Sequence, residues 1–368
     1  MKTPNILLKY FVEVNDVPEM GKGLTLLKDV SAGTCLIMER PIFTAIDLGM
    51  SEMDENLLKL LKGKLNGLTK GDGEDKQFGK AMQRAFLQLQ NCRQDPREKI
   101  NPIVGTWLTN NITISTGCIG NDFVLHKGVF EVTSRINHSC LPNASFFYDK
   151  DTGMAMIYAI KDLKAGDEIY ISYNNQFATA FERQADLEER WRFVCRCKLC
   201  ALPRSESKMI DRLMVEAEDI RTFLADEKKY LDTPLEYLSR ARKLVDVCIS
   251  IGITDKRICL GWFAAFRVTA FHGDMARASI FADLASRANA LCEGSDAPRS
   301  WLLSDCVNDP SRHIELEGNV EFKGDDGKKR GLRWTTKIND FPKEWMESKT
   351  VDSLWGFDTP DMELGLEK

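Results

Sequence analysis

The first 50 residues alternate short apolar runs with Gly, Asp and Ser, as in "GKGLTLLKDVSAGTCLIMERPIF" (residues 21–43). Such runs, bounded by turn residues, predict β-strands and hairpins. Over residues 51–106 the spacing of Leu becomes helical, as in "ENLLKLLKGKL" and "FGKAMQRAFLQLQ". Short strand patterns return over residues 107–176, for example "MAMIYAI" and "DEIYISY". The pattern therefore predicts a β-rich domain interrupted by a helical insert.

The rest of the chain has a helical period. A predicted helix within residues 177–203 ends at "VCRCKLC", and residues 204–293 read as successive antiparallel helices with short loops. This C-terminal all-α domain fits either a TPR-like stack or a plain helical cap. Residues 294–368 mix Trp with charged runs such as "FKGDDGKKRG" and show no period, which predicts an irregular tail. The expected fold class is α+β.

Composition narrows the function classes. The chain has 368 residues, 43% hydrophobic and 29% charged, which is normal for a soluble globular protein, and its formal net charge is −5. This balance argues against direct nucleic-acid binding through bulk charge, and it leaves room for an acidic cleft that attracts a basic peptide. The N-terminal residues contain no long apolar run, so we expect neither a signal peptide nor a membrane segment.

The cysteines predict a metal site. The chain has 11 Cys without a secretory signal, which fits a reducing compartment. "CRCKLC" places Cys195, Cys197 and Cys200 as C-x-C-x-x-C, and structural zinc prefers four such ligands. Cys140 is the best candidate for the fourth ligand, and Cys92 and Cys118 are the alternatives. A cluster of reduced thiols without metal, or a redox C-x-x-C pair, would be the competing interpretations.

The stretch "RINHSCLPNASFFYD" (residues 135–149) sets Asn137 and His138 beside Cys140, and Pro142 then stops any helix. Taken alone, such a loop is most simply explained by side chains that satisfy buried backbone groups. It does not stand alone, because "AIKDLKAGDEIYISY" and "FVCRCKLC" follow it in order.

Together these motifs resemble those of SET-domain lysine methyltransferases with a post-SET zinc site, over roughly residues 10–200. The closest subgroup by motif is the SMYD-like SET proteins, although residues 45–110 contain only Cys92 and no His, so the MYND zinc finger of that subgroup is missing. The resemblance implies an N-terminal SET segment (1–50), a SET-I-like helical insert (51–106), a core SET segment (107–176) with a pseudoknot-like loop, and a post-SET segment (177–203).

The resemblance also assigns roles to residues. It implies that S-adenosylmethionine binds on one face of the domain and the substrate lysine on the other, joined by a narrow channel. Tyr173 would be the catalytic residue. The implied cofactor-binding residues are Lys22, Gly23, Asn110, Asn137, His138, Tyr173 and Phe193, the implied channel residues are Tyr158 and Ile171, and the implied zinc ligands are Cys140, Cys195, Cys197 and Cys200.

We therefore expect a protein-lysine N-methyltransferase that uses S-adenosylmethionine and carries one structural zinc. Its partner would be a lysine-containing protein, histone or non-histone, and we expect a monomer in the nucleus, the cytoplasm or both, with no membrane partner. The alternative is a non-catalytic SET-fold scaffold whose helical half binds a partner. Cofactor binding distinguishes the two.

Overall fold

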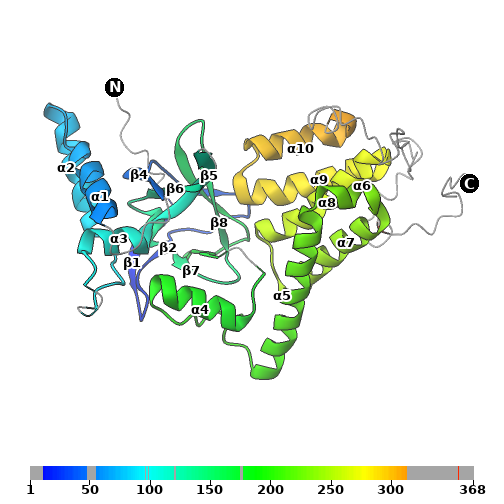
Figure 1. Cartoon of the computed structure of the whole chain (residues 1–368), viewed down its shortest axis with the longest axis horizontal. Coiled ribbons are helices and arrows are strands. Elements are labelled where there is room, and N and C mark those ends of the chain that lie inside the picture. The colour runs from blue at the N-terminus through cyan, green and yellow to red at the C-terminus, as the bar shows by residue number, and fades with distance from the viewer. Residues whose placement is uncertain are drawn as a thin grey trace, which may run out of the picture. The chain divides into compact units, whose positions relative to one another are not determined.

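The computed structural model describes residues 11–47, 55–95, 97, 99–119, 122–174, 177–312 and 355. The chain forms two compact units. The first comprises residues 1–174 and 180–202, and the second comprises residues 175–179 and 203–368. The described strands all belong to the first unit, whereas the second is built from helices (Figure 1). The predicted α+β class is confirmed.

Four small sheets form the first unit. One is a hairpin, two have three strands in the orders β3-β9-β8 and β4-β6-β5, and the fourth pairs β10 with β7. The strands are β1 (Val12–Val17), β2 (Gly21–Leu26), β3 (Cys35–Glu39), β4 (Phe43–Asp47), β5 (Ile112–Ile119), β6 (Asp122–Val129), β7 (Asn137–His138), β8 (Ala144–Asp149), β9 (Met154–Ala159) and β10 (Tyr170–Ile171).

The shortest sheet joins distant parts of the chain. β7 and β10 run parallel, with Asn137 opposite Tyr170 and His138 opposite Ile171. A 3₁₀ turn, Thr133–Arg135, leads into β7, and Ile136 and Ile169 beside the paired residues are almost fully buried. They belong to an apolar cluster that includes Leu24, Leu36 and Ile157. Each strand pairs over only two residues, so the buried apolar residues beside the pairing hold the two strands in place.

The helices of the predicted insert (51–106) are α1 (Glu55–Leu68), α2 (Gly73–Leu87) and α3 (Pro102–Asn110). The last of them runs four residues past the predicted end at residue 106, into the segment where the sequence pattern predicts strands. Leu57, Leu61 and Leu65 recur every four residues on α1 and are buried. Trp107 of α3 stacks on Phe43 of β4 at 5.4 Å between ring centroids. This packing sets the position of Asn110 at the end of α3.

The remaining helix of the first unit is α4 (Ala180–Trp191), and the second unit contains α5 (Arg204–Ala225), α6 (Glu227–Asp232), α7 (Pro234–Ile251), α8 (Lys256–Phe271), α9 (Met275–Glu293) and α10 (Pro298–Asn308). Consecutive helices from α7 to α10 pack against each other. Asp255 and Asp274 cap α8 and α9 and form buried ion pairs with Arg257 and Arg277. A TPR-like stack stays a prediction. None of the described helices is both long and apolar enough to span a membrane.

The prediction of an irregular tail is wrong at its beginning, because α10 lies within it. Only Ser300, Leu303 and Cys306 of this helix are buried, while Trp301 is 63% exposed. Because this apolar face is so narrow, the sequence of α10 shows no helical spacing of apolar residues. Trp355, further along the tail, is also buried, with its ring 4.8 Å from that of Phe281 and 5.8 Å from that of Trp262.

Substitution of Gly79 tests the packing of α2 on α1. A Cβ at Gly79 would lie 1.8 Å from the carbonyl oxygen of Leu68, so Gly79→Ala must push the two helices apart. We expect a loss of about 1–3 kcal/mol in the free energy of unfolding, measured by urea denaturation. Gly63→Ala on α1 is the matched control, because nothing lies within 4 Å of its added Cβ. It should be stabilising by about 0.5–1 kcal/mol, and equal effects of the two variants would contradict this packing.

Candidate functional site

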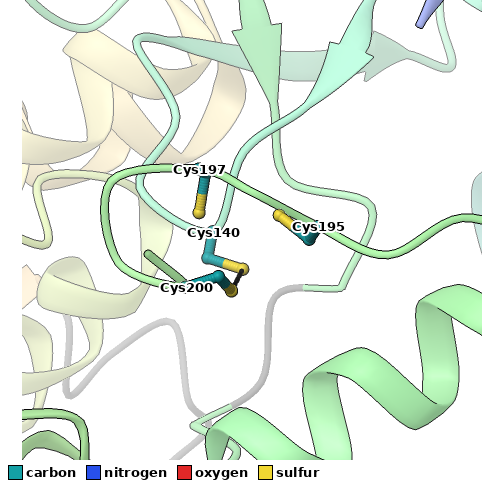
Figure 2. A group of neighbouring side chains, drawn as sticks. All are labelled: Cys140, Cys195, Cys197 and Cys200. Carbon is teal, nitrogen blue, oxygen red and sulfur yellow. Dashed lines mark hydrogen bonds between the residues drawn. The ribbon is translucent and has the colours of Figure 1, made fainter. Parts of the chain in front are cut away.

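Four cysteines from two distant segments converge in the first unit. Cys140 follows β7, and Cys195, Cys197 and Cys200 follow α4 (Figure 2). Their Sγ atoms all lie within 4.8 Å of one another, and those of Cys140 and Cys200 are 3.6 Å apart. A tetrahedral zinc with Zn–S bonds of about 2.3 Å needs sulfur atoms about 3.8 Å apart. The cluster could therefore hold zinc.

The surroundings of the cluster suit a metal. Hydrogen bonds among the thiols lower the pKa of Cys200 and Cys197 and raise the pKa of Cys140, so a bound metal would have to displace the proton of Cys140. Thiolates are the form that binds metal. Buried Arg183 places Nη2 3.9 Å from the Cys200 sulfur, where its positive charge offsets part of the thiolate charge.

The alternative fourth ligands do not join this cluster in the described structure. The thiol of Cys92 lies 3.1 Å from the Thr109 hydroxyl instead. The side chain of Cys118 lies outside the described part of the chain. Among the described residues, Cys140 is the one that completes the set of four.

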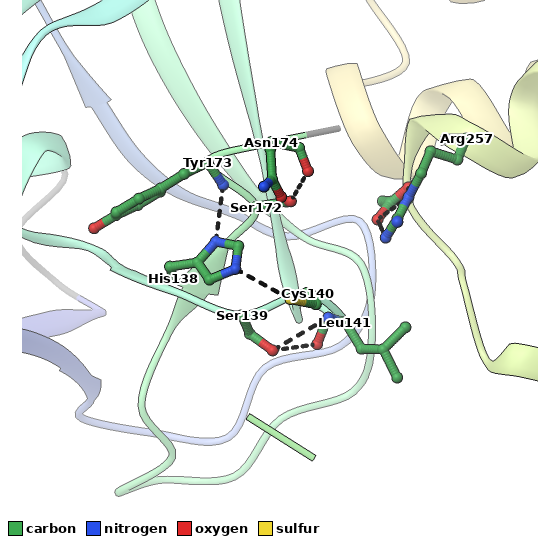
Figure 3. A network of polar contacts seen from close by, with 9 residues as sticks. His138, Ser139, Cys140, Leu141, Ser172, Tyr173, Asn174 and Arg257 are labelled. Atoms are coloured by element: carbon green, nitrogen blue, oxygen red, sulfur yellow. Dashed lines mark hydrogen bonds and ion pairs between the residues drawn. The ribbon is translucent and has the colours of Figure 1, made fainter. Parts of the chain in front are cut away.

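His138 connects the cysteine cluster to Tyr173 (Figure 3). The backbone N–H of Tyr173 donates to His138 Nδ1 at 3.0 Å, so Nδ1 carries no proton in the neutral ring. The proton is then on Nε2, which lies 3.3 Å from the sulfur of Cys140 and donates to it. A hydrogen bond of this kind orients a metal ligand from outside the coordination sphere. One buried imidazole therefore joins two parts of the site.

A pocket of about 710 Å³ lies beside His138. Six of the seven predicted cofactor-binding residues line it, contributed by the β1–β2 hairpin, the end of α3, β7 and the segment from residue 173 to 196. The full lining is Pro18, Glu19, Met20, Lys22, Gln90, Cys92, Thr109, Asn110, Ser134, Arg135, Asn137, His138, Tyr173, Trp191, Arg192, Phe193, Val194 and Arg196.

Gly23, the seventh predicted residue, is not among the residues that line the pocket. A Cβ at this position would lie 2.5 Å from Val17 Cγ2, 2.6 Å from Glu168 Oε1 and 2.9 Å from Asn137 Nδ2. The glycine thus lets Glu168 and Asn137 approach the backbone of β2 closely.

The predicted channel residues Tyr158 and Ile171 are not part of this lining. Ile171 belongs to the buried apolar cluster of the first unit. Tyr158 lies on β9, half-buried, with its hydroxyl 3.1 Å from the sulfur of Met156. Their channel roles stay predictions.

Tyr173 is held by an aromatic cluster and by its own hydroxyl. The hydroxyl donates to the carbonyl oxygen of Ile136 at 2.7 Å. Its ring lies 5.1 Å from that of His138 and 4.9 Å from that of Trp191, and it meets Phe193 edge-on at 6.4 Å. Burial, reinforced by the negative charge of Glu168, raises the pKa of Tyr173 well above its usual value. The phenol is therefore neutral, with oxygen lone pairs still available.

Sequence reasoning missed several lining residues. Trp191 contacts Tyr173, and its indole N–H donates to the carbonyl oxygen of Thr109 at 3.1 Å, which joins the ends of α4 and α3. The aromatic pair in "WRF" before the cysteine cluster was an available signal. Arg135 could have been found as the residue that opens the Asn-His motif. Lys22, Arg135, Arg192 and Arg196 make the lining basic, since Glu19 is the one acidic lining residue in the described structure.

Comparison with known proteins assigns a domain within the first unit. The SET domain family model matches residues 21–174. These residues form a SET domain. The matched residues include most of the pocket lining, and the exceptions are Pro18, Glu19, Met20 and the residues from Trp191 onward. The three cysteines after α4 lie beyond the end of the match.

The relatives of this SET domain carry methyltransferase names. Histone-lysine N-methyltransferase set5 of Schizosaccharomyces pombe is 26% identical over 308 residues, covering 83% of this chain and 86% of that protein. Protein-lysine N-trimethyltransferase SMYD5 of Homo sapiens is 34% identical over 83 residues, covering 22% of this chain but only 20% of that protein. The resemblance to SMYD-like proteins is confirmed.

Solved structures of SET domains are also similar to the chain. The SET domain of LSMT bound to lysine and AdoHcy covers 86% of this chain with 91% of its own, at 12% identity and a TM-score of 0.31.

Zinc content tests the cysteine cluster. We expect about one zinc per chain in the purified protein, measured by atomic absorption, because structural zinc takes four thiolates. Cys197→Ser should lose most of the metal. Cys35→Ser is the matched control, because the Cys35 thiol hydrogen-bonds the Ile37 carbonyl and is not part of the cluster. Metal-free wild-type protein, or equal zinc in both variants, would contradict the assignment.

Proposed function

We propose that the chain is an S-adenosylmethionine-dependent protein-lysine N-methyltransferase. The observation that carries this proposal is the pocket, in which Asn137, His138 and Tyr173 from two SET motifs meet Lys22, Asn110 and Phe193. The names of the relatives point to the same chemistry.

The pocket offers suitable contacts for each part of this cofactor. Its basic side chains suit a carboxylate, and the half-buried ring of Phe193 offers an aromatic face for a base. Met20 and Lys22 of the β1–β2 hairpin also line the pocket. The cysteine cluster would hold zinc as a structural ion, because four thiolates leave no open coordination position.

The proposed reaction is a single displacement. The lone pair of a neutral lysine amine forms an N–CH₃ bond while the S–CH₃ bond of the sulfonium breaks, which leaves S-adenosylhomocysteine, and the amine then releases a proton to solvent. A free lysine has a pKa of about 10.4, so the site must favour the neutral amine by burial. Alignment of the two reactants supplies much of the rate.

Tyr173 is the residue we assign to catalysis. Its hydroxyl hydrogen is committed to the carbonyl of Ile136, so the oxygen can offer lone pairs to the polarised methyl group or to the amine. The neighbouring rings of His138 and Trp191 restrict its movement. The side chain is thereby oriented before substrate binds.

The substrate we propose is a lysine-containing protein, and histones are the first class to test because relatives are named histone-lysine methyltransferases. A histone substrate would place the activity in the nucleus, and a non-histone substrate would allow activity in the cytoplasm as well. A monomer is consistent with a first unit that has its own apolar clusters.

Loss of the Tyr173 hydroxyl tests the proposal. With zinc-replete protein, labelled S-adenosylmethionine and a histone mixture, we expect methyl-lysine in the wild type, identified by mass spectrometry. Tyr173→Phe should lower kcat by about 10²–10³-fold, since it removes one preorganised polar group from the reacting centre.

Tyr148→Phe is the control, because Tyr148 lies on β8 and does not line the pocket. It should retain wild-type activity. Equal activity of Tyr173→Phe and wild type would exclude the catalytic role. A folded wild type that binds no S-adenosylmethionine would instead favour the non-catalytic scaffold.

A further inference from the structure

We propose that Arg183 is a positioning residue of the cysteine cluster, and that its positive charge keeps a zinc ion bound there and makes the sulfur atoms less reactive towards electrophiles. Arg183 is not itself a ligand, because a guanidinium has no lone pair to offer a metal. It acts through Cys140 and Cys200. The inference concerns the metal site alone and does not depend on the proposed methyltransferase activity.

The position of Arg183 is the first observation. The residue lies near the start of α4, and its side chain is only 2% exposed. Its Nη2 donates to Cys200 Sγ at 3.9 Å, and its guanidinium also hydrogen-bonds the sulfur of Cys140. Cys140 follows β7 and Cys200 follows α4, so one buried cation contacts both segments that build the cluster.

The charge of a loaded cluster is the second observation. Four thiolates and one Zn²⁺ carry a net charge of −2, and the cluster is largely buried. Burying a charge is costly unless an opposite charge or hydrogen bonds compensate for it. A guanidinium in contact with two of the four sulfur atoms supplies that compensation, and buried Arg183 gains its own counter-charge in return.

Other groups near the cluster do not replace this charge. Arg196 lies within the C-x-C-x-x-C run, but its side chain is 73% exposed and pairs with a glutamate of the β1–β2 hairpin. Lys198, also within the run, is exposed. His138 donates to Cys140 as a neutral ring and therefore adds no positive charge. These contacts single out Arg183 as the compensating cation.

The third observation is how the cation is held in place. The neighbouring Gln184 donates its side-chain N–H to the Cys195 carbonyl at 2.7 Å and accepts from the Cys195 backbone N–H at 2.8 Å. Leu187, one turn further along α4, is completely buried. The start of α4 is thus bound to the start of the cysteine run, and Arg183 cannot move away from the sulfur atoms without breaking these contacts.

Metal affinity is the first readout of the test, measured on the full zinc-loaded chain by competition with a zinc chelator. Arg183→Met removes the charge and keeps an apolar stem of similar length. We expect about 10–100-fold weaker zinc binding, the usual cost of losing a group that supports metal ligands from outside. Arg183→Lys restores a positive charge and should stay within about threefold of wild type. Arg190→Met is the matched control, because Arg190 lies on the same helix with an exposed side chain paired with Asp186.

Cobalt substitution is the second readout, and it separates charge from packing. Co²⁺ bound by thiolates absorbs light by charge transfer from sulfur to metal. Loss of the cation raises the energy of the sulfur lone pairs, so Arg183→Met should shift this band to longer wavelength. Gln184→Ala loosens the cysteine run without changing any charge, so it should weaken metal binding and leave the band in place.

Alkylation by iodoacetamide measures reactivity directly. A cysteine sulfur forms an S–C bond while the C–I bond breaks and iodide leaves. Sulfur atoms that lose a neighbouring cation are stronger nucleophiles. We therefore expect faster alkylation of the zinc-loaded cluster in Arg183→Met than in wild type, with Arg190→Met equal to wild type.

The outcomes decide the assignment. Weaker zinc binding with a shifted cobalt band in Arg183→Met, both reversed in Arg183→Lys, supports it. Wild-type zinc affinity or an unshifted band in folded Arg183→Met overturns it. Circular dichroism verifies folding, and Arg183→Gln, with the same expected band shift, replaces the Met variant if that variant does not fold. None of these readouts uses S-adenosylmethionine, so the result is independent of the proposed reaction.

Discussion

The site depends on the parallel pairing of β7 with β10. Two residues of each strand pair, yet this contact brings the Asn-His-Ser-Cys loop beside the segment that carries Glu168 and Tyr173. So short a ladder contributes little by itself, and the buried Ile136 and Ile169 next to it supply the apolar contacts that hold it. A slip of one residue would turn Asn137 and His138 each to the face opposite its present one, so the pocket would lose Asn137 and Cys140 would lose its hydrogen bond from His138.

His138 makes the pocket and the cysteine cluster mutually dependent. Its two ring nitrogens contact the backbone of Tyr173 and the sulfur of Cys140, so a movement of either partner is transmitted to the other. The segment after α4 adds a second connection, because Phe193 lines the pocket two residues before Cys195. A metal in the cluster would hold this segment in place, which gives a structural zinc an influence on ligand binding without any part in the reaction.

Much of this site was predictable from the sequence, since its motifs are local. The Asn-His-Ser-Cys run and the C-x-C-x-x-C run each occupy a few consecutive residues, and their chemistry needs those residue types together. What the sequence did not reveal were contacts between segments. Trp191 and Glu168 act through partners far along the chain, and the missing side chain of Gly23 makes room for Glu168 and Asn137. The helix α10 was missed because three buried residues on eleven leave almost no periodic signal.

The most direct test of the account is a calorimetric titration of the zinc-replete wild-type protein with S-adenosylmethionine, repeated after removal of zinc with a chelator. The pocket and its connection through His138 predict saturable binding of one cofactor per chain, with a lower affinity in the zinc-free protein. Absence of binding by folded, zinc-loaded protein would contradict the central claim that this pocket is a cofactor site.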